Sequence, residues 1–235
     1  KLIITERHEA WESLARKLAH EIKNPLTPIQ LTIDRLKDKF SEALSADEKS
    51  NFTDSLKIID KQIKQIENLV NEFSDFARMP KPILKDNNLI SIISDNLKLL
   101  KTLDENIKID FINKKNEILF RSDNEQLSRV FFNLIKNAIE SVKEKNQENS
   151  NTKGKISIEI NDYDDYIEFI IKDNGKGFKG LKNIKEILNP YFTTKKTGTG
   201  LGLAIVNKII NDHNGSIKFA NLEDGAKVTV EFLKL

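Results

Sequence analysis

The first residue whose position suggests chemistry is His20, in the sequence HEIKNP. The apolar residues Leu18 and Ile22 flank it, and at about 100° per helical residue its imidazole is rotated roughly 200° from both. A histidine that faces away from the apolar side is available as a nucleophile or a proton carrier. Glu21 adjoins it, and Asn24 lies one helical turn further along the same face. These spacings predict a reactive histidine with a carboxylate and an amide beside it.

The proline after this group and the other two histidines are given structural interpretations. Pro25 follows directly and is expected to bend the helix or open its backbone hydrogen bonds. The other two histidines, His8 and His213, lack comparable neighbours, so we interpret both as structural.

A second set of residues, further along the chain, favours nucleotide binding. Asn133 and Asn137 lie four positions apart on a predicted helix, so both amides face the same way. Amide oxygens suit Mg²⁺, and amide N–H groups can donate to phosphate. Asp173 follows a predicted strand in the sequence DNGKG, where Gly175 and Gly177 allow a ligand to approach the backbone.

A third glycine group completes this pattern. Gly198, Gly200 and Gly202 open a predicted helix, whose free N–H groups and dipole favour phosphate. Their spacing matches neither the Rossmann fingerprint nor the P-loop. The segment before them is interpreted as a lid and contains Tyr191, Phe192, Thr193, Thr194 and Lys195. Each feature alone is common in turns and on surfaces, but together and in this order they predict one ligand site.

The elements that position these residues fall into two groups. All nine glycines lie at or after Gly154, and residues 1–79 are predicted to be almost entirely helical. Residues 80–86, PKPILKD, hold two of the five prolines. Because proline ends helices and restricts the preceding residue, this segment is predicted to be a linker.

Residues 1–79 carry two apolar seams at heptad spacing. The later seam consists of Phe52, Leu56, Ile59, Ile63, Ile66, Val70 and Phe73. The earlier seam consists of Trp11, Ala15, Leu18, Ile22, Pro25 and Ile29, continued after a stutter by Ile33, Leu36 and Phe40. Joined by residues 41–50, the two seams predict an antiparallel helical hairpin. Since two helices bury little surface alone, we expect a four-helix bundle formed by a dimer.

Residues 87–235 are predicted to contain both helices and strands. Helices are predicted over 89–103, 123–145 and 201–212, and strands over 107–113, 118–122, 155–162, 166–173, 216–222 and 227–235. A solvated loop is expected at 143–154, and an Asp-Gly turn at Asp224–Gly225 joins the last two strands. This order of helices and mostly antiparallel strands predicts an α+β sandwich of one sheet and one helical layer.

Composition excludes several classes of function. The 38 Lys+Arg nearly balance the 36 Asp+Glu, so charge gives no general case for nucleic-acid binding. The absence of cysteine excludes disulfides, thiolate metal sites and a cysteine nucleophile. The sequence has no run of 18 apolar residues that could span a membrane. It begins at Lys1 without a signal-peptide pattern, and we interpret it as a fragment of a longer protein.

Five motifs together resemble those of the sensor histidine kinases of two-component systems. They are HEIKNP at 20–25, NLIKNA at 133–138, DNGKGF at 173–178, PYFTTK at 190–195 and GTGLGL at 198–203. The resemblance covers essentially the whole chain, and HEIKNPLTPIQL together with FSDFARMP looks most like the NtrY-type branch. It implies a dimerisation and phosphoacceptor hairpin at 1–79, a linker at 80–86, and a catalytic ATP-binding domain of the Bergerat (GHKL) type at 87–235.

The resemblance also implies residue roles. His20 would be the phosphoacceptor, Glu21 its base or orienting carboxylate, and Asn24 would position water for dephosphorylation of the partner. Asn137 would bind Mg²⁺, and Asn133 would contact phosphate.

The remaining implied roles concern the nucleotide. Asp173 would accept the adenine amino group, and Gly175 and Gly177 would shape the adenine pocket. The lid and its hinge would supply further nucleotide contacts from Lys195, Gly198, Thr199, Gly200, Leu201 and Gly202. One departure stands out: many relatives carry lysine three residues after the Mg²⁺ asparagine, where this chain has Glu140, whose role we leave open.

The implied reaction is Mg-ATP-dependent autophosphorylation on His20, then phosphotransfer to an aspartate of a response regulator receiver domain, with phosphatase activity as a further possibility. The expected partners are a second copy of the chain and that regulator, with no nucleic acid. The chain is expected to be cytoplasmic and to reach a membrane only through segments of the longer protein outside it.

Two alternatives stay open at this point. A GHKL ATPase of the chaperone, topoisomerase or repair type would couple ATP to conformational change without an acceptor histidine. A non-catalytic dimeric scaffold would need neither His20 nor an intact nucleotide site.

Overall fold

The computed structural model describes residues 2–40, 45–101, 106–148, 153–178, 180, 183–195 and 198–234. Side chains are described from Ala15 onward, apart from Arg16, Ala46 and Asp47 within that range. The predicted seam residue Trp11 lies outside the described side chains, and residues 41–44 of the predicted connection lie outside the described residues. The predicted connection at 41–50 was too long, because a helix already begins at Ala46. None of the helices in the described ranges is long and apolar enough to cross a membrane.

The chain divides into two compact units, each of which is described by itself. The first comprises Lys1–Pro80 with Thr194–Leu201, and the second comprises Lys81–Thr193 with Gly202–Leu235.

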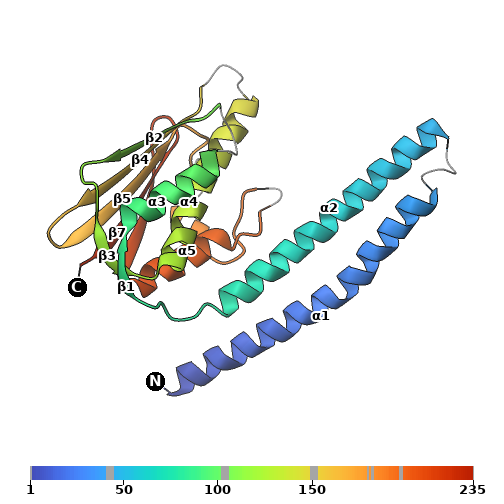
Figure 1. Ribbon diagram of the computed structural model, residues 1–235, viewed down its shortest axis with the longest axis horizontal. Helices are drawn as coiled ribbons and strands as arrows, with labels where there is room; N and C mark the ends of the chain where they lie inside the picture. Colours follow the sequence, from blue (N-terminus) through green and yellow to red (C-terminus); the bar gives the residue numbers. More distant parts are fainter. Residues whose placement is uncertain are drawn as a thin grey trace. The chain divides into compact units, whose positions relative to one another are not determined.

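The first unit is built on a hairpin of two long helices, α1 (Leu2–Phe40) and α2 (Ala46–Ala77), which lie side by side (Figure 1). Ser45 starts α2 through a capping box, in which the Glu48 carboxylate accepts the Ser45 backbone N–H at 3.2 Å. Helix α1 continues through Pro25 and Pro28. Because neither proline has an N–H, each leaves one carbonyl of the preceding turn without its helical donor.

The hairpin has a small apolar core. Leu26 and Ile33 of α1 pack with Leu56 and Ile63 of α2, each less than 8% exposed, and Phe52 packs against this cluster. Truncating one such residue to alanine typically costs about 2–5 kcal/mol. A hydrogen bond of 2.7 Å from the Gln30 amide to Asp60 joins the two helices beside this core.

The seam prediction for α1 was partly wrong. Ala15 and Ile33 are buried as predicted, but Ala19 and Leu26 occupy the other buried positions. The predicted seam residues Leu18, Ile22, Ile29 and Leu36 are 37–45% exposed, as are Ile59 and Ile66 on α2 at 44% and 43%. A helix with a single neighbour buries only one narrow stripe, so half of a heptad seam is left outside the hairpin.

The second unit has one helical layer on one face of a five-stranded sheet (Figure 1). Its helices are α3 (Leu89–Lys101), α4 (Asn124–Glu148) and α5 (Gly202–Asp212), with a short 3₁₀ helix η1 (Ile184–Leu188). Its strands are β1 (Lys85–Asn88), β2 (Lys108–Asn113), β3 (Leu119–Ser122), β4 (Lys155–Asp162), β5 (Tyr166–Asp173), β6 (Gly215–Asn221) and β7 (Ala226–Leu233). The predicted α+β sandwich is confirmed.

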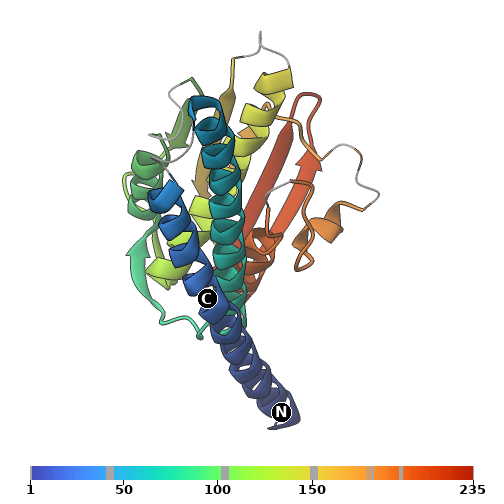
Figure 2. The same ribbon diagram turned by 90° about the vertical axis from the view of Figure 1, so that its right-hand side faces the viewer.

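The strand order in the main sheet is β2-β4-β5-β7-β6. Strands β2 and β4 run parallel, and the other three neighbouring pairs run antiparallel. Strands β6 and β7 form an antiparallel hairpin, drawn in red in Figure 2. A separate pair joins β1 to β3, with Lys85 and Asp86 opposite Ser122 and Arg121. Two residues of the predicted linker are therefore part of a strand.

Aromatic side chains pack between the helical layer and the sheet of this unit. The ring of Phe131 on α4 lies 4.7 Å from that of Phe169 on β5, and both are buried. Ion pairs such as Lys172–Glu159 and Lys218–Glu231 join side chains of neighbouring strands. These four charges lie on partly exposed strand surfaces.

His213 has the structural role expected for it. It is 3% exposed, its Nδ1 lies 2.8 Å from the Ile209 carbonyl, and its Nε2 accepts the Asp123 N–H at 3.0 Å. Asp123 in turn accepts the Ile83 N–H at 2.9 Å. Both ring nitrogens therefore serve internal hydrogen bonds that tie α5 to the start of α4.

Candidate functional site

The phosphoacceptor candidate lies on α1. His20 is exposed, with Glu21 and Asn24 also exposed beside it, while the preceding Ala19 is 4% exposed against the hairpin. Glu21 Oε1 lies 4.0 Å from Lys17 Nζ, and both side chains are more than half exposed, so this pair holds Glu21 only weakly. The three groups can therefore reach an incoming reactant without opening the hairpin core.

The two asparagines lie on α4 near the start of α5. Asn133 donates its amide N–H to the Arg129 carbonyl at 2.8 Å, which turns its Oδ1 outward from its own helix. A Cβ placed on Gly202, the first residue of α5, would lie 3.3 Å from that oxygen. Asn133 and Asn137 are both half-buried. The structure thus places the half-buried amide of Asn133 beside the N-terminus of α5, with Asn137 one helical turn further along α4.

Asp173 lies at the end of β5 and is 7% exposed. Its carboxylate accepts the Gly175 N–H at 2.8 Å and also a hydrogen bond from the Ala226 backbone. Burial raises the pKa of Asp173 to about 6, against the lowering effect of these two hydrogen bonds. The group is mainly ionised above that pH, where it is an acceptor for a ligand N–H.

Two glycines leave no space for a side chain around this carboxylate. A Cβ on Gly175 would lie 2.3 Å from Ser141 Oγ, and one on Gly225 would lie 1.9 Å from the Asp173 carbonyl oxygen. Gly225 also has φ +100°, in the region that favours glycine. The predicted Asp-Gly turn therefore packs directly on the backbone of Asp173, a contact that sequence reasoning missed.

Sequence reasoning also missed two side chains of α4. Ser141 Oγ accepts the Lys176 N–H at 3.1 Å, and Lys145 Nζ donates to the Asn174 carbonyl at 2.8 Å and pairs with the Asp224 carboxylate. The available signal was spacing: Ser141 and Lys145 continue the four-residue steps of the two asparagines.

Most of the residues from which we expected nucleotide contacts in the lid belong to the first unit. Residues Thr194–Leu201 group with the helical hairpin, and there the Thr199 hydroxyl donates a hydrogen bond to Glu72 of α2. Gly200 has φ +72°, and the Leu201 N–H donates to Thr199 Oγ at 3.4 Å. The nucleotide contacts expected of Lys195, Gly198 and Thr199 to Leu201 therefore stay predictions.

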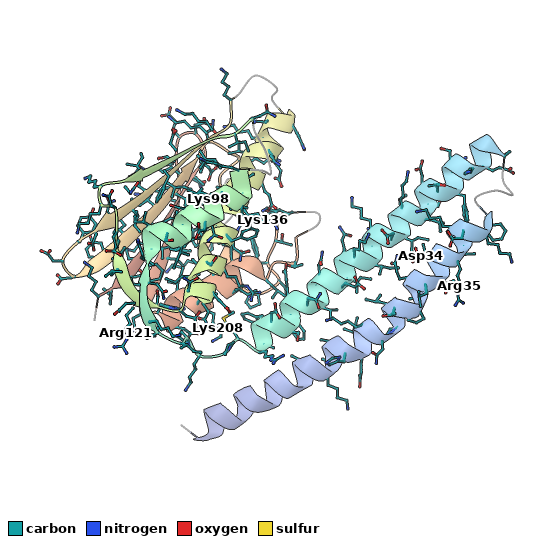
Figure 3. The ribbon with its side chains drawn as sticks, in the orientation of Figure 1. Asp34, Arg35, Lys98, Arg121, Lys136 and Lys208 are labelled. Atoms are coloured by element: carbon teal, nitrogen blue, oxygen red, sulfur yellow. The ribbon has the colours of Figure 1, made fainter. Side chains whose placement is uncertain are left out.

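Glu140 and Lys136 form an ion pair of 3.8 Å on the partly exposed surface of α4, where Figure 3 labels Lys136. The described residues contain no group of three or more His, Cys, Asp or Glu that could hold a metal ion. A cation beside Asn137 could take its other ligands from a nucleotide and from water. Mg²⁺ commonly binds in this way, so the donor set fits it.

Comparisons with known proteins agree on both units. The family model of the His Kinase A (phospho-acceptor) domain matches residues 10–82, and that of the histidine kinase-, DNA gyrase B- and HSP90-like ATPases matches residues 122–235. The chain is 40% identical, over 98% of its length, to a sensor histidine kinase of Rickettsia prowazekii described as NtrY-like, and spans 37% of that protein.

Solved structures give the same result. The catalytic domain of the histidine kinase ThkA is similar with a TM-score of 0.56 and 30% identity, covering 64% of this chain and 97% of that one. ThkA in complex with the response regulator TrrA is similar with a TM-score of 0.67 and 26% identity, covering 98% of this chain and 64% of that one.

Proposed function

The chain belongs to the sensor histidine kinases, and from that premise we propose that it transfers the γ-phosphate of ATP to His20 and then to an aspartate of a response regulator. The observation that carries the proposal is the exposed His20, beside Glu21 and Asn24, in a chain that also holds an ATPase-type unit. A chaperone-type or topoisomerase-type ATPase needs no such histidine. The match to the phospho-acceptor family model supports the kinase over that alternative.

In the proposed reaction, the nucleotide is held by the second unit. Asp173 accepts the adenine amino group, and Asn133 contacts phosphate. Asn137 would bind Mg²⁺, which when bound neutralises charge on the phosphate oxygens. The N-terminus of α5 at Gly202 offers free backbone N–H groups to phosphate. Positioning and charge neutralisation of this kind supply most of what phosphoryl transfer requires.

The first unit supplies the acceptor. A neutral ring nitrogen of His20 attacks the γ-phosphorus, a nitrogen–phosphorus bond forms, and the bond to the β-phosphate oxygen breaks to release ADP. The proton on the other ring nitrogen can pass to Glu21 or to water. A receiver-domain aspartate then takes the phosphoryl group, as the complex of the similar kinase ThkA with TrrA suggests.

We propose functional boundaries at 1–79 for the phosphoacceptor hairpin, 80–86 for the linker and 87–235 for the ATP-binding domain, with the last two linker residues, Lys85 and Asp86, also forming the start of β1. Because ATP and receiver domains are cytoplasmic reactants, the proposal puts these residues in the cytoplasm, with any membrane anchor outside this chain.

The direct test of this function is incubation of the purified chain with Mg-ATP labelled at the γ-phosphate. Phosphate on the protein that is labile in acid and stable in base supports the kinase. Hydrolysis of ATP without a phosphoprotein would favour the ATPase alternative, and failure to bind Mg-ATP at millimolar concentration would favour the scaffold.

Replacing Asn24 with alanine should leave autophosphorylation within about twofold of wild type but slow loss of phosphate from the regulator about tenfold or more, because water is no longer positioned. The decay of phosphorylated regulator mixed with each protein measures this. Asn51→Ala, which removes another exposed amide of the hairpin, is the matched control. Unchanged decay with Asn24→Ala would remove Asn24 from the phosphatase reaction.

We further propose that the hairpin dimerises through its exposed seam. Ile29 and Ile66, 45% and 43% exposed, lie on the half of the heptad pattern that the hairpin leaves outside. The double substitution Ile29→Glu with Ile66→Glu should weaken the dimer at least about 100-fold, because charge would be buried in an apolar interface. Sedimentation equilibrium measures the effect.

Ile58→Glu is the control for that experiment, since Ile58 is 63% exposed but lies off the seam. It should leave the dimer intact. A double variant that still dimerises with wild-type affinity would show that the interface lies elsewhere.

A further inference from the structure

Helix α4 carries a row of polar residues that continues beyond the predicted nucleotide contacts. Asn133, Asn137, Ser141 and Lys145 follow one another at four-residue steps, the spacing of one ridge on a helix surface. The proposed function uses only the first two. The last two contact the loop that follows Asp173.

Lys145 links two segments that are far apart in the sequence. Its Nζ donates to the Asn174 carbonyl at 2.8 Å and pairs with the carboxylate of Asp224 in the β6–β7 turn. The Lys145 side chain is 20% exposed, and that of Asp224 is 61% exposed. The lysine is thus the more enclosed partner, and its charge is shared between a carbonyl and a carboxylate.

Both segments act directly on Asp173. Asn174 is its neighbour in the chain, and a Cβ on Gly225 would overlap the Asp173 carbonyl oxygen at 1.9 Å. Ala226, which follows Gly225, gives the Asp173 carboxylate a backbone hydrogen bond. A shift of the turn would therefore alter the hydrogen bond that helps to orient that carboxylate.

We propose that Lys145 is a positioning residue for adenine recognition, because it ties the Asn174 backbone to Asp224 and so fixes the β6–β7 turn against Asp173. The proposal rests on the proposed role of Asp173 as the adenine contact. Ser141, which accepts the Lys176 N–H, holds the same loop from the other side of Gly175.

The charge of Lys145 adds a second effect that can be measured. Lys145 lowers the pKa of Asp173, and Asp224 raises it, while burial is the larger cause of the raised value. Among the described residues, the charged groups that act on Asp173 are these two, from α4 and from the β6–β7 turn, and the nearby Lys176 is paired with Glu144 at 3.6 Å. Loss of the lysine charge should move the titration of Asp173 to higher pH.

The test uses ADP binding to the whole chain, measured by calorimetry from pH 5.5 to 8.5, and autophosphorylation kinetics. Lys145→Met keeps the aliphatic stem and removes the charge. It should weaken ADP binding about tenfold at pH 8, the size expected for one charge-assisted hydrogen bond, and move the pH midpoint of binding upward. KM for ATP should rise while kcat changes less than about threefold. Lys145→Arg should restore most of the affinity.

Lys98→Met is the matched control, because it removes an exposed lysine that pairs with Asp95 on α3 (Figure 3). Asp224→Asn removes the carboxylate partner of Lys145 and so breaks the same ion pair. It should also weaken ADP binding, but move the pH midpoint downward, since Asp224 raises the pKa of Asp173. Should Lys145→Met fail to fold, as judged by circular dichroism, this second variant decides the proposal.

Wild-type affinity and an unchanged pH midpoint in the folded Lys145→Met variant, or in Asp224→Asn where that variant decides, would overturn the inference. Asp173→Asn separates this result from a failure of the site itself. If Asp173→Asn loses ADP and Lys145→Met does not, only the positioning role is wrong. If Asp173→Asn binds ADP normally, the adenine assignment and the inference resting on it both fail.

Discussion

Replacement of His20 by glutamine should abolish ATP-dependent phosphorylation of the chain, a fall of at least about 10³-fold, while ADP affinity stays within about twofold of wild type. Glutamine can still hydrogen-bond at this position but has no ring nitrogen to attack the γ-phosphorus. His20 is exposed on α1, outside the hairpin core, so the substitution should not unfold the protein. Labelling with γ-phosphate and calorimetry with ADP measure the two quantities.

His8→Gln makes the same chemical change on the same helix and should leave phosphorylation unchanged. Circular dichroism of both variants should match that of the wild type. Phosphorylation that survives in His20→Gln would show that another residue accepts the phosphate, and loss of ADP binding would show that the substitution disturbs more than the acceptor.

Asp173→Asn should lower ADP affinity at least about 100-fold at pH 8 and leave the hairpin folded. An ionised carboxylate accepts a hydrogen bond from the adenine amino group. The asparagine amide can instead turn its own N–H groups toward that amino group, so that two buried donors face each other without an acceptor. Since the pKa of Asp173 is about 6, nucleotide binding to the wild type should also weaken as the pH falls below that value. Calorimetry at several pH values measures both effects.

The same substitution should change the pH dependence of stability. The pKa of Asp173 is raised from 3.8 to about 6, so without nucleotide the folded chain binds more protons than the unfolded chain between these values. The stability that this group contributes is therefore present below about pH 4 and lost as the pH rises through about 6. The loss amounts to about 3 kcal/mol. Asp173→Asn removes this dependence.

Urea unfolding at pH 5 and pH 8 tests this linkage, with Asp95→Asn as the control because Asp95 is 67% exposed. Above pH 7 the Asp173→Asn protein should be at least as stable as the wild type although it no longer binds nucleotide. A variant that loses stability and affinity together at pH 8 would indicate that the carboxylate serves the fold and not the ligand.

Much of the second unit could be predicted from sequence because its signals are local. Period-2 alternation at 155–162 and 166–173 marks β4 and β5 with the bounds that the structure shows. The parallel pairing of β2 with β4 could not be read in this way, since it depends on how β3 and α4 cross between them. In the hairpin, the apolar periodicity predicted both helices. It did not predict which residues of each seam contact the other helix and which stay exposed.

In the candidate site, too, the residues in local motifs could be predicted and the contacts between distant residues could not. Asn133, Asn137 and Asp173 lie in short motifs whose chemistry is visible in a few consecutive residues. The contact between Lys145 and Asp224 joins residues 79 positions apart. Ala226 lies opposite Asp173 only because β5 and β7 pair in that register. His20 is exposed as predicted, although Leu18 and Ile22, which set its expected phase, are themselves partly exposed.

The position of the phosphate on the protein shows directly whether His20 is the phosphoacceptor. The wild-type chain should be incubated with Mg-ATP, digested near neutral pH to preserve phosphohistidine, and the peptides analysed by mass spectrometry. We expect a single major phosphopeptide that contains His20, with fragments that place the phosphate on its imidazole. Phosphate on a different residue, or ATP hydrolysis with no phosphopeptide at all, would contradict it.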